Sequence, residues 1–378
     1  MIATDDVVHL AEQATLGGLL LAPAHFREVN GWLRGQDFTD PWHRMAWVAL
    51  READAAGRTL DAEHLAADLL DRHGPRVADI VRVHDLLVAV PKDPDPRPHA
   101  RVVVEFGVRR EIASQGVLLE GAAALAAMHL EARPLHAALR IVGAGLLVAG
   151  ERWAEASGEG SAHLAAQLPT QLKAGAASLE LRRTADKLVA HAPQLDAADL
   201  EVNEARLVAC LVSHPTAISP TIAWLRPDRL LNKPWRTVYV ALGDMAERGQ
   251  SIDPVSLATA VLRTSMITGA APTAGELAQA VVNERISVPG HLRRLVAADH
   301  LRQLAHSGAH ALRTGAANPG TQIVDLLDTA TVLIQSLRQT ASVMPDVVGS
   351  GSVAHMPVLR DRAPWRRPDQ ERGGPVAG

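Results

Sequence analysis

Cysteine, lysine and aromatic residues are scarce in this chain of 378 residues. A single cysteine, Cys210, excludes an intrachain disulfide and a cluster of thiolate metal ligands. Aromatic residues make up 3% of the chain, and β-branched runs are few beside the good helix formers Ala, Leu, Arg and Glu. The composition therefore predicts an all-α protein. Cys210 lies in an apolar helix pattern, which predicts that it is a small core residue.

The sequence also lacks the motifs of nucleotide chemistry. The only lysines are Lys92, Lys173, Lys187 and Lys233. None of them follows a glycine, so the chain has no G-x-x-x-x-G-K-[ST] loop to hold nucleotide phosphates. Ser, His and Asp are scattered without a nucleophile motif, and 143–145 does not fit the dinucleotide pattern. We therefore expect no catalytic residue, no cofactor and no enzyme activity.

Long apolar runs and a strong charge of one sign are missing as well. A formal charge of -4 and a pI near 6.5 argue against broad nucleic-acid binding, which needs many clustered cations. No apolar run reaches the length that spans a bilayer, and the N-terminal residues 1–6 are acidic where a signal peptide is basic. We expect a soluble, cytoplasmic protein without membrane contact.

Histidine is plentiful, with 17 residues, and one pair has the spacing of metal ligands. His306 and His310 lie one turn apart on a predicted helix. The nearest carboxylate on that face, Asp299, is two turns away, and Gly308 weakens the helix between the histidines. We therefore expect structural or surface roles for these histidines and no metal site.

The main feature that is present is an internal duplication. Residues near 12–70 align with residues near 204–262 at a constant offset of 192, without a gap. Matches of Trp, Pro, Gly and Asp carry this alignment, as in Trp32 with Trp224 and Gly57 with Gly249. Such matches at one offset do not arise by chance in an alanine-rich chain, so the chain contains two copies of one domain.

Capping signals repeat together with the apolar pattern. A helix is expected after the N-cap Asp40 in the first copy and after Asn232 in the second, each followed closely by proline. A further helix is expected after Asp61 and after Asp253. The two tryptophans of the alignment fall on apolar helix faces, which predicts that they anchor the core rather than stack on nucleic acid.

Each small bundle is followed by a predicted pair of long helices. The pairs span 98–129 with 132–155, and 289–313 with 319–341, with turn signals between the helices. Such hairpins carry more apolar surface than one bundle covers. Because one chain supplies both, we expect them to pack together as an internal pseudo-two-fold dimer, with a higher homo-oligomer as a further step.

These patterns divide the chain into four parts. We expect the first copy at 1–155, a partly helical linker at 156–202, the diverged second copy at 203–341 and a disordered tail at 342–378. The fold class expected is all-α, with two copies of a small helical bundle that each precede a long antiparallel hairpin.

The first copy resembles the N-terminal domain of DnaB-type hexameric replicative helicases. Residues 11–21 read AEQATLGGLLL, where the family typically has AEQAVLGALLL, and 37–44 read DFTDPWHR, similar to its DFY-x-P-x-HR segment. The segment 57–61 resembles the family's G-x-P-I-D turn, and 100–103 (ARVV) together with 109–111 (RRE) resembles the start of its dimerising hairpin. The second copy diverges: Trp235-Arg236 replaces His-Arg, although 252–255 (IDPV) keeps the turn.

In that family the domain carries no chemistry but pairs through its hairpin and contacts primase and loader proteins. The resemblance therefore implies a non-catalytic replication accessory protein that binds replicative helicase, primase or helicase loader. Two alternatives remain: a factor for DNA binding or plasmid maintenance, with weak DNA contact by the tail, and a helicase-derived subunit that acts with a separate ATPase. The residues predicted to contact a partner are Arg44, Arg236, Arg109, Arg110, Trp365, Arg366 and Arg367.

Overall fold

The structure is a computed structural model that describes all residues except 1–3, 161, 193–195 and 346–378. The described residues form sixteen α-helices, five short 3₁₀ helices and no strand. The prediction of an all-α protein is therefore confirmed. The predicted disordered tail lies almost wholly outside the described residues, which end at Pro345.

The first bundle consists of five helices and two short 3₁₀ turns. They are α1 (Thr4–Leu21), η1 (Pro23–His25), α2 (Phe26–Trp32), η2 (Gly35–Asp37), α3 (Pro41–Ala55), α4 (Ala62–His73) and α5 (Ile80–Val88). Asp40 caps α3 by accepting a hydrogen bond from the backbone N–H of Trp42, and Asp61 caps α4 through His64. Both predicted caps are confirmed. Phe26, Phe38 and Trp47 form its fully buried aromatic centre.

The second bundle repeats this order. It comprises α10 (Ala197–Ser213), η4 (Pro215–Ala217), α11 (Ile218–Trp224), η5 (Pro227–Arg229), α12 (Lys233–Glu247), α13 (Pro254–Thr268) and α14 (Ala274–Asn283). Asn232 caps α12 and Asp253 caps α13, as the sequence predicts. Tyr239 is fully buried in the core of this bundle, and its hydroxyl donates to the carbonyl of Leu225.

Two long hairpins occupy the middle of the molecule. The first is α6 (Arg97–His129) with α7 (Arg133–Ser157), and the second is α15 (Pro289–Ala317) with α16 (Ile323–Ala341). Their apolar faces share one hydrophobic core, so the two hairpins pack on each other within one chain. The expected internal pairing is therefore present in the structure.

The helices α6 and α15 form the main contact between the hairpins and run antiparallel. Arg109 of α6 lies at the C-terminal end of α15, whereas Glu120, three turns further along α6, reaches His306 near the middle of α15. The backbone at Gly116 lies close to Ala309: a Cβ atom at position 116 would stand only 3.2 Å from the Cα of Ala309. Since Gly116 and Gly308 are equivalent at the offset of 192, this crossing marks the pseudo-two-fold centre.

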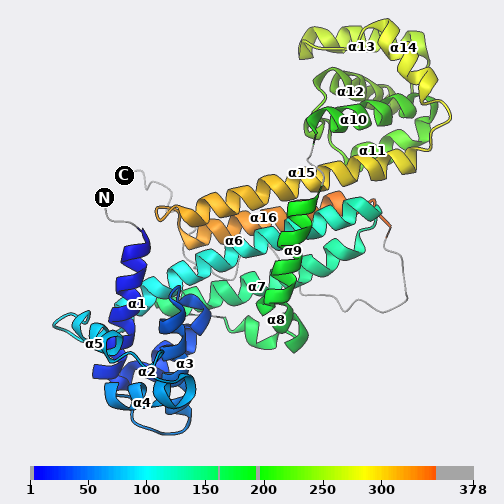
Figure 1. The fold of residues 1–378 in the computed structure, drawn as a ribbon. Helices are drawn as coiled ribbons and strands as arrows, with labels where there is room; N and C mark the ends of the chain where they lie inside the picture. Colours follow the sequence, from blue (N-terminus) through cyan, green and yellow to red (C-terminus); the bar gives the residue numbers. More distant parts are fainter. Residues whose placement is uncertain (1–3, 161, 193–195, 346–378) are drawn as a thin grey trace, which may run out of the picture.

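Figure 1 shows the resulting arrangement, with the two bundles at opposite ends of the four hairpin helices. The segment between the copies adds η3 (Leu164–Gln167), α8 (Thr170–Ala177) and α9 (Leu179–His191). Helix α9 packs across α6, where the missing side chain of Gly121 admits Ala185. No helix among the described residues is long and apolar enough to cross a membrane.

Candidate interaction sites of the two bundles

A buried carboxylate organises the first bundle. Glu12 of α1 is fully buried and accepts hydrogen bonds from the backbone N–H groups of Thr39 and Asp40, just before α3. His43 of α3 donates a third hydrogen bond, 2.7 Å long, from Nδ1 to the same carboxylate. Glu12 therefore fixes the start of α3 against α1, because these backbone donors have no partner inside the helix.

The environment of Glu12 also sets its ionisation. Burial by itself raises the pKa of this carboxyl group, but the hydrogen bonds from His43 and from the backbone before α3 outweigh it. As a result, the pKa of Glu12 lies below its ordinary value. The carboxylate is held charged as a structural acceptor.

The second bundle uses the equivalent carboxylate in a different way. Glu204 of α10 is 1% exposed and accepts from the backbone N–H groups of Leu231 and Asn232, just before α12. Its histidine partner is His300, whose Nε2 lies 2.7 Å from Oε1 of Glu204. Because His300 belongs to α15, this contact joins the bundle to its hairpin.

In the first copy a buried cluster of charges joins the bundle to its hairpin. Arg152 of α7 is 5% exposed and forms ion pairs with Asp37 of η2 and, at 3.0 Å, with Glu111 of α6. Its Nε donates to the carbonyl of Trp32. Gly107 of α6 leaves the space that Asp37 fills. Removal of Arg152 would leave two buried carboxylates without this ion-pair partner.

Polar contacts also tie the two hairpins together. Arg109 is 2% exposed, pairs with Glu105 and donates to three carbonyls of the α15–α16 turn, at residues 318, 319 and 321. Glu120 accepts from His306 at 2.7 Å and from Arg313 at 3.2 Å. Arg109 was predicted to contact a partner. In the structure its side chain is buried and hydrogen-bonded within the chain, at the interface between the two copies.

Arg44 and Arg236 occupy equivalent places, as their alignment predicts. The guanidinium of Arg44 donates to the carbonyl of Phe38, and that of Arg236 donates to the carbonyl of Leu230, its equivalent at the offset of 192. Arg44 is exposed and Arg236 is half-buried. Both therefore brace the turn before the third helix of their bundle.

Of the four other residues predicted to contact a partner, the structure describes one. Arg110 is exposed on α6 and donates to the carbonyl of Asp37. Trp365, Arg366 and Arg367 lie outside the described residues.

Sequence reasoning missed an exposed apolar surface on the second bundle. Val255, Leu262 and Met266 of α13 are 76%, 66% and 83% exposed. They follow one another at i, i+7 and i+11, which places them on one face of the helix. Ile267, the next residue after Met266, is 88% exposed and extends this exposed apolar surface around the helix. We call these four residues the α13 apolar face. The spacing of these apolar residues in the sequence was the signal that could have revealed this surface.

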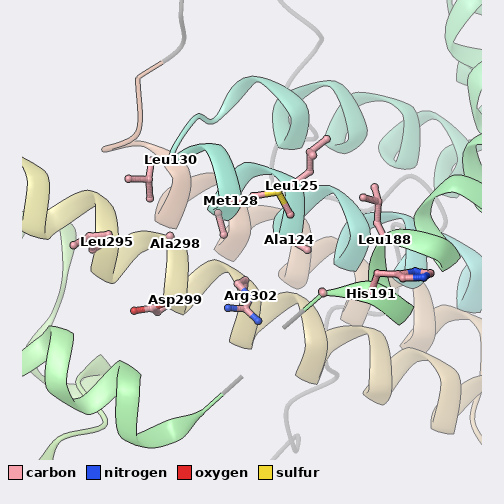
Figure 2. Close-up of a pocket in the computed structure, with 12 residues that line it drawn as sticks. Ala124, Leu125, Met128, Leu130, Leu188, His191, Leu295, Ala298, Asp299 and Arg302 are labelled. Carbon is pink, nitrogen blue, oxygen red and sulfur yellow. The ribbon is translucent and has the colours of Figure 1, made fainter. Parts of the chain in front are cut away.

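A cavity of about 230 Å³ lies where α6, α9 and α15 meet, as Figure 2 shows. Its walls are largely apolar, and His191, Asp299 and Arg302 stand among the residues that line it. Burial raises the pKa of Asp299 above its ordinary value, and Asn203 donates to this carboxylate at 2.8 Å. This cavity lies between the linker helix and the junction of the second bundle with its hairpin, where Leu295 packs against the core of that bundle.

Three further predictions can be compared with the structure. Cys210 is fully buried, donates to the carbonyl of Ser287 and has its pKa raised to about 11, first by burial and then by nearby Glu284. Trp32 is buried, which confirms its core role. Trp224 is only half-buried and donates to the carbonyl of Thr340 on α16, so it joins the bundle to the hairpin.

Comparisons with known proteins identify the duplicated region. The family described as DnaB-like helicase N terminal domain matches residues 7–105 and again residues 197–295, which together cover just over half of the chain. Each range holds one bundle and the beginning of its hairpin. No ATPase domain is among the family matches.

A curated relative supports the same relationship. The replicative DNA helicase DnaB of Mycobacterium leprae (strain TN) is 32% identical over 108 residues, which cover 28% of this chain and 18% of that helicase. The chain thus matches less than a fifth of the length of this relative. No solved structure matches significantly. With two family matches on two helical bundles, the chain belongs to the DnaB-like helicase N-terminal domain family.

Proposed function

We propose that this chain is a non-catalytic accessory protein of DNA replication in the cytoplasm. It binds the replicative helicase, primase or helicase loader through its two helicase N-terminal domains. The observation that carries the proposal is the packing of both hairpins within one chain. One molecule thereby presents two linked bundles in a fixed arrangement, without needing a second chain to form the pair.

The geometry of the described residues supports a binding role. The buried carboxylates Glu12 and Glu204 are saturated by helix-start and histidine donors, and Arg152 is saturated by its carboxylate partners. These charged groups hold helices in place. Apolar side chains and arginines that are exposed on the outer surfaces of the bundles remain accessible to a protein partner.

The α13 apolar face is the surface that we assign to the partner within the replication machinery. The equivalent helix of the first bundle, α4, has one exposed large apolar side chain, Leu70, which is 47% exposed. Exposed apolar side chains that gather on one helix face mark sites of protein contact. We assign the apolar part of the contact to this face of the second bundle, and the charged part to exposed Arg44 of the first bundle and exposed Arg110 of the adjoining helix α6.

Affinity capture from an extract of the source cells, followed by mass spectrometry, tests this function. The full chain is expected to retain helicase, primase or loader, and the double substitution Met266→Glu with Ile267→Glu is expected to lose at least tenfold of the captured partner. Val332→Glu is the matched control, because Val332 is 61% exposed on α16, away from the bundle. Equal capture by the wild type and the α13 variant would overturn the assigned surface.

The other functions give different results in the same experiment. Retention of DNA without a replication protein would support a DNA-binding or plasmid-maintenance factor. Co-purification of a RecA-like ATPase subunit would support a helicase-derived subunit. Magnesium-dependent ATP hydrolysis by the purified chain, well above a mock preparation, would contradict the non-catalytic role.

A further inference from the structure

Three side chains with metal-binding atoms meet beside the N-terminal half of α1 in the first bundle. His9 and Glu12 lie one turn apart on α1, and His43 comes from the first turn of α3. One ligand atom from each of the three lies within 4.8 Å of the others. Glu12 and His43 are buried, whereas His9 is exposed and its ring centroid is 5.0 Å from that of His43.

This combination of two imidazoles and a carboxylate is a donor set for a divalent transition metal. Zinc accepts the same ligands at a catalytic-type site, where water takes the remaining position. The arrangement is specific to one copy, because Glu201 and Trp235 stand at the positions of His9 and His43 in the second bundle. Glu204 there has neither of these imidazoles, and the histidine that it contacts is His300 of α15.

We propose that His9, Glu12 and His43 form a binding site for a divalent transition-metal ion, with Zn²⁺ as the best match. Imidazole and carboxylate ligands with an open side toward solvent favour this class of ion over Mg²⁺ or Ca²⁺, which prefer oxygen ligands. A bound ion links α1 to the beginning of α3. It therefore clamps the first bundle, while the second bundle stays independent of metal.

Binding of the ion requires the loss of one proton and a small movement of the ligand side chains. The ion replaces the proton between Nδ1 of His43 and the Glu12 carboxylate, and that proton goes to solvent without any redox step. These two atoms are 2.7 Å apart, whereas ligand atoms around tetrahedral zinc stand about 3.3 Å apart for bonds of about 2.0–2.1 Å. The pair must open slightly, and the exposed His9 ring must turn inward to close the site.

Metal titration of the full, untagged chain tests the proposal. Co²⁺ and Zn²⁺ are added separately, with absorption of bound Co²⁺ and calorimetry of Zn²⁺ as readouts. We expect one ion per chain in addition to any weak surface binding, and we expect His9→Ala to weaken this site at least tenfold. His9 is exposed, so this variant keeps its fold, which circular dichroism verifies. His64→Ala is the control, because His64 is another exposed histidine of the first bundle.

Thermal unfolding gives an independent readout. Zn²⁺ is expected to raise the melting temperature of the wild type and of His64→Ala, but not that of His9→Ala, because a ligand stabilises only the state that binds it. Binding of Zn²⁺ that is weaker than 100 µM, or equal binding by the wild type and His9→Ala, would overturn the proposal. A melting temperature that rises equally in all three proteins would do the same.

Discussion

The two bundles share their internal caps but differ in how they attach to the hairpins. Glu12 and Glu204 both hold the start of the third bundle helix through two backbone N–H groups. The histidine on Glu12 comes from within its bundle, whereas the histidine on Glu204 comes from α15. A change in the position of one histidine thus converts an internal brace into a link between bundle and hairpin.

The first copy makes its link by other means. Asp37 and Glu111 pair with Arg152, and the positions equivalent to the two carboxylates in the second copy are Arg229 and Gln303. The second copy therefore cannot form the same cluster. The two copies thus share the backbone caps but bury the junction between bundle and hairpin with different polar contacts. Stability measurements on matched substitutions can test this difference.

The largest effect is expected when the charge cluster of the first copy is broken. Arg152→Met removes the cation that forms ion pairs with the buried carboxylates of Asp37 and Glu111, which should cost about 3–5 kcal/mol in the free energy of unfolding. Urea denaturation of the full chain measures the loss. Arg140→Met is the control, since Arg140 is exposed on the same helix. Equal stability of the two variants would mean that the cluster does not hold the junction.

The two equivalent tryptophans should respond unequally. Trp32→Ala removes a side chain that is 6% exposed and should cost about 3–5 kcal/mol. Trp224 is half-buried, and so Trp224→Ala should cost roughly 2 kcal/mol, because less apolar area is lost from the folded state. Hydrogen exchange should show that Trp224→Ala mainly exposes the junction of α11 with α16. A larger loss for Trp224→Ala would contradict this ranking.

Much of the fold could be predicted because its signals are local. The caps at Asp40, Asn232, Asp61 and Asp253 follow from the chemistry of helix starts, and the hairpin helices follow from long apolar periods broken by turns. Pairing of the hairpins followed from the duplication itself, since one chain supplies both apolar surfaces.

The candidate sites were harder to predict because their partners are distant in the sequence. His300 contacts Glu204 across 96 positions, and Arg152 contacts Asp37 across 115. Neither spacing leaves a periodic signal. Arg109 was expected to contact a partner, yet it is engaged by a turn more than 200 positions away. Trp224 was predicted to anchor the core of its own bundle, but it is half-buried. Its contact with Thr340 of the last helix is also distant in the sequence and leaves no periodic signal.

Acid should weaken the first bundle through Glu12. Its pKa is lower in the folded chain than its ordinary value of 4.5, so the stabilisation is complete above that value. It is lost as the pH falls through the folded pKa, where the carboxylate takes up a proton. Glu12→Gln should cost about 1–3 kcal/mol at neutral pH and should flatten this part of the pH profile. A stability profile of Glu12→Gln that parallels the wild type down to acid pH would contradict the assignment.

The smallest expected effect concerns Arg44 and Arg236, the pair that the two bundles keep most alike. Each donates to the carbonyl six residues earlier, so Arg44→Ala and Arg236→Ala should each cost about 0.5–1.5 kcal/mol, the usual net value of one hydrogen bond. Urea denaturation of the full chain measures both losses.

Partner capture distinguishes a structural role of Arg44 in the turn before α3 from a role in binding the partner. Arg44 is exposed, and if it also contacts the partner, Arg44→Ala should reduce capture by more than its small loss of stability explains. Glutamine at position 44 keeps a donor but removes the charge. Full capture by Arg44→Gln and by Arg44→Ala would show that this arginine serves only the turn before α3, and the contact with the partner would then depend on the α13 apolar face.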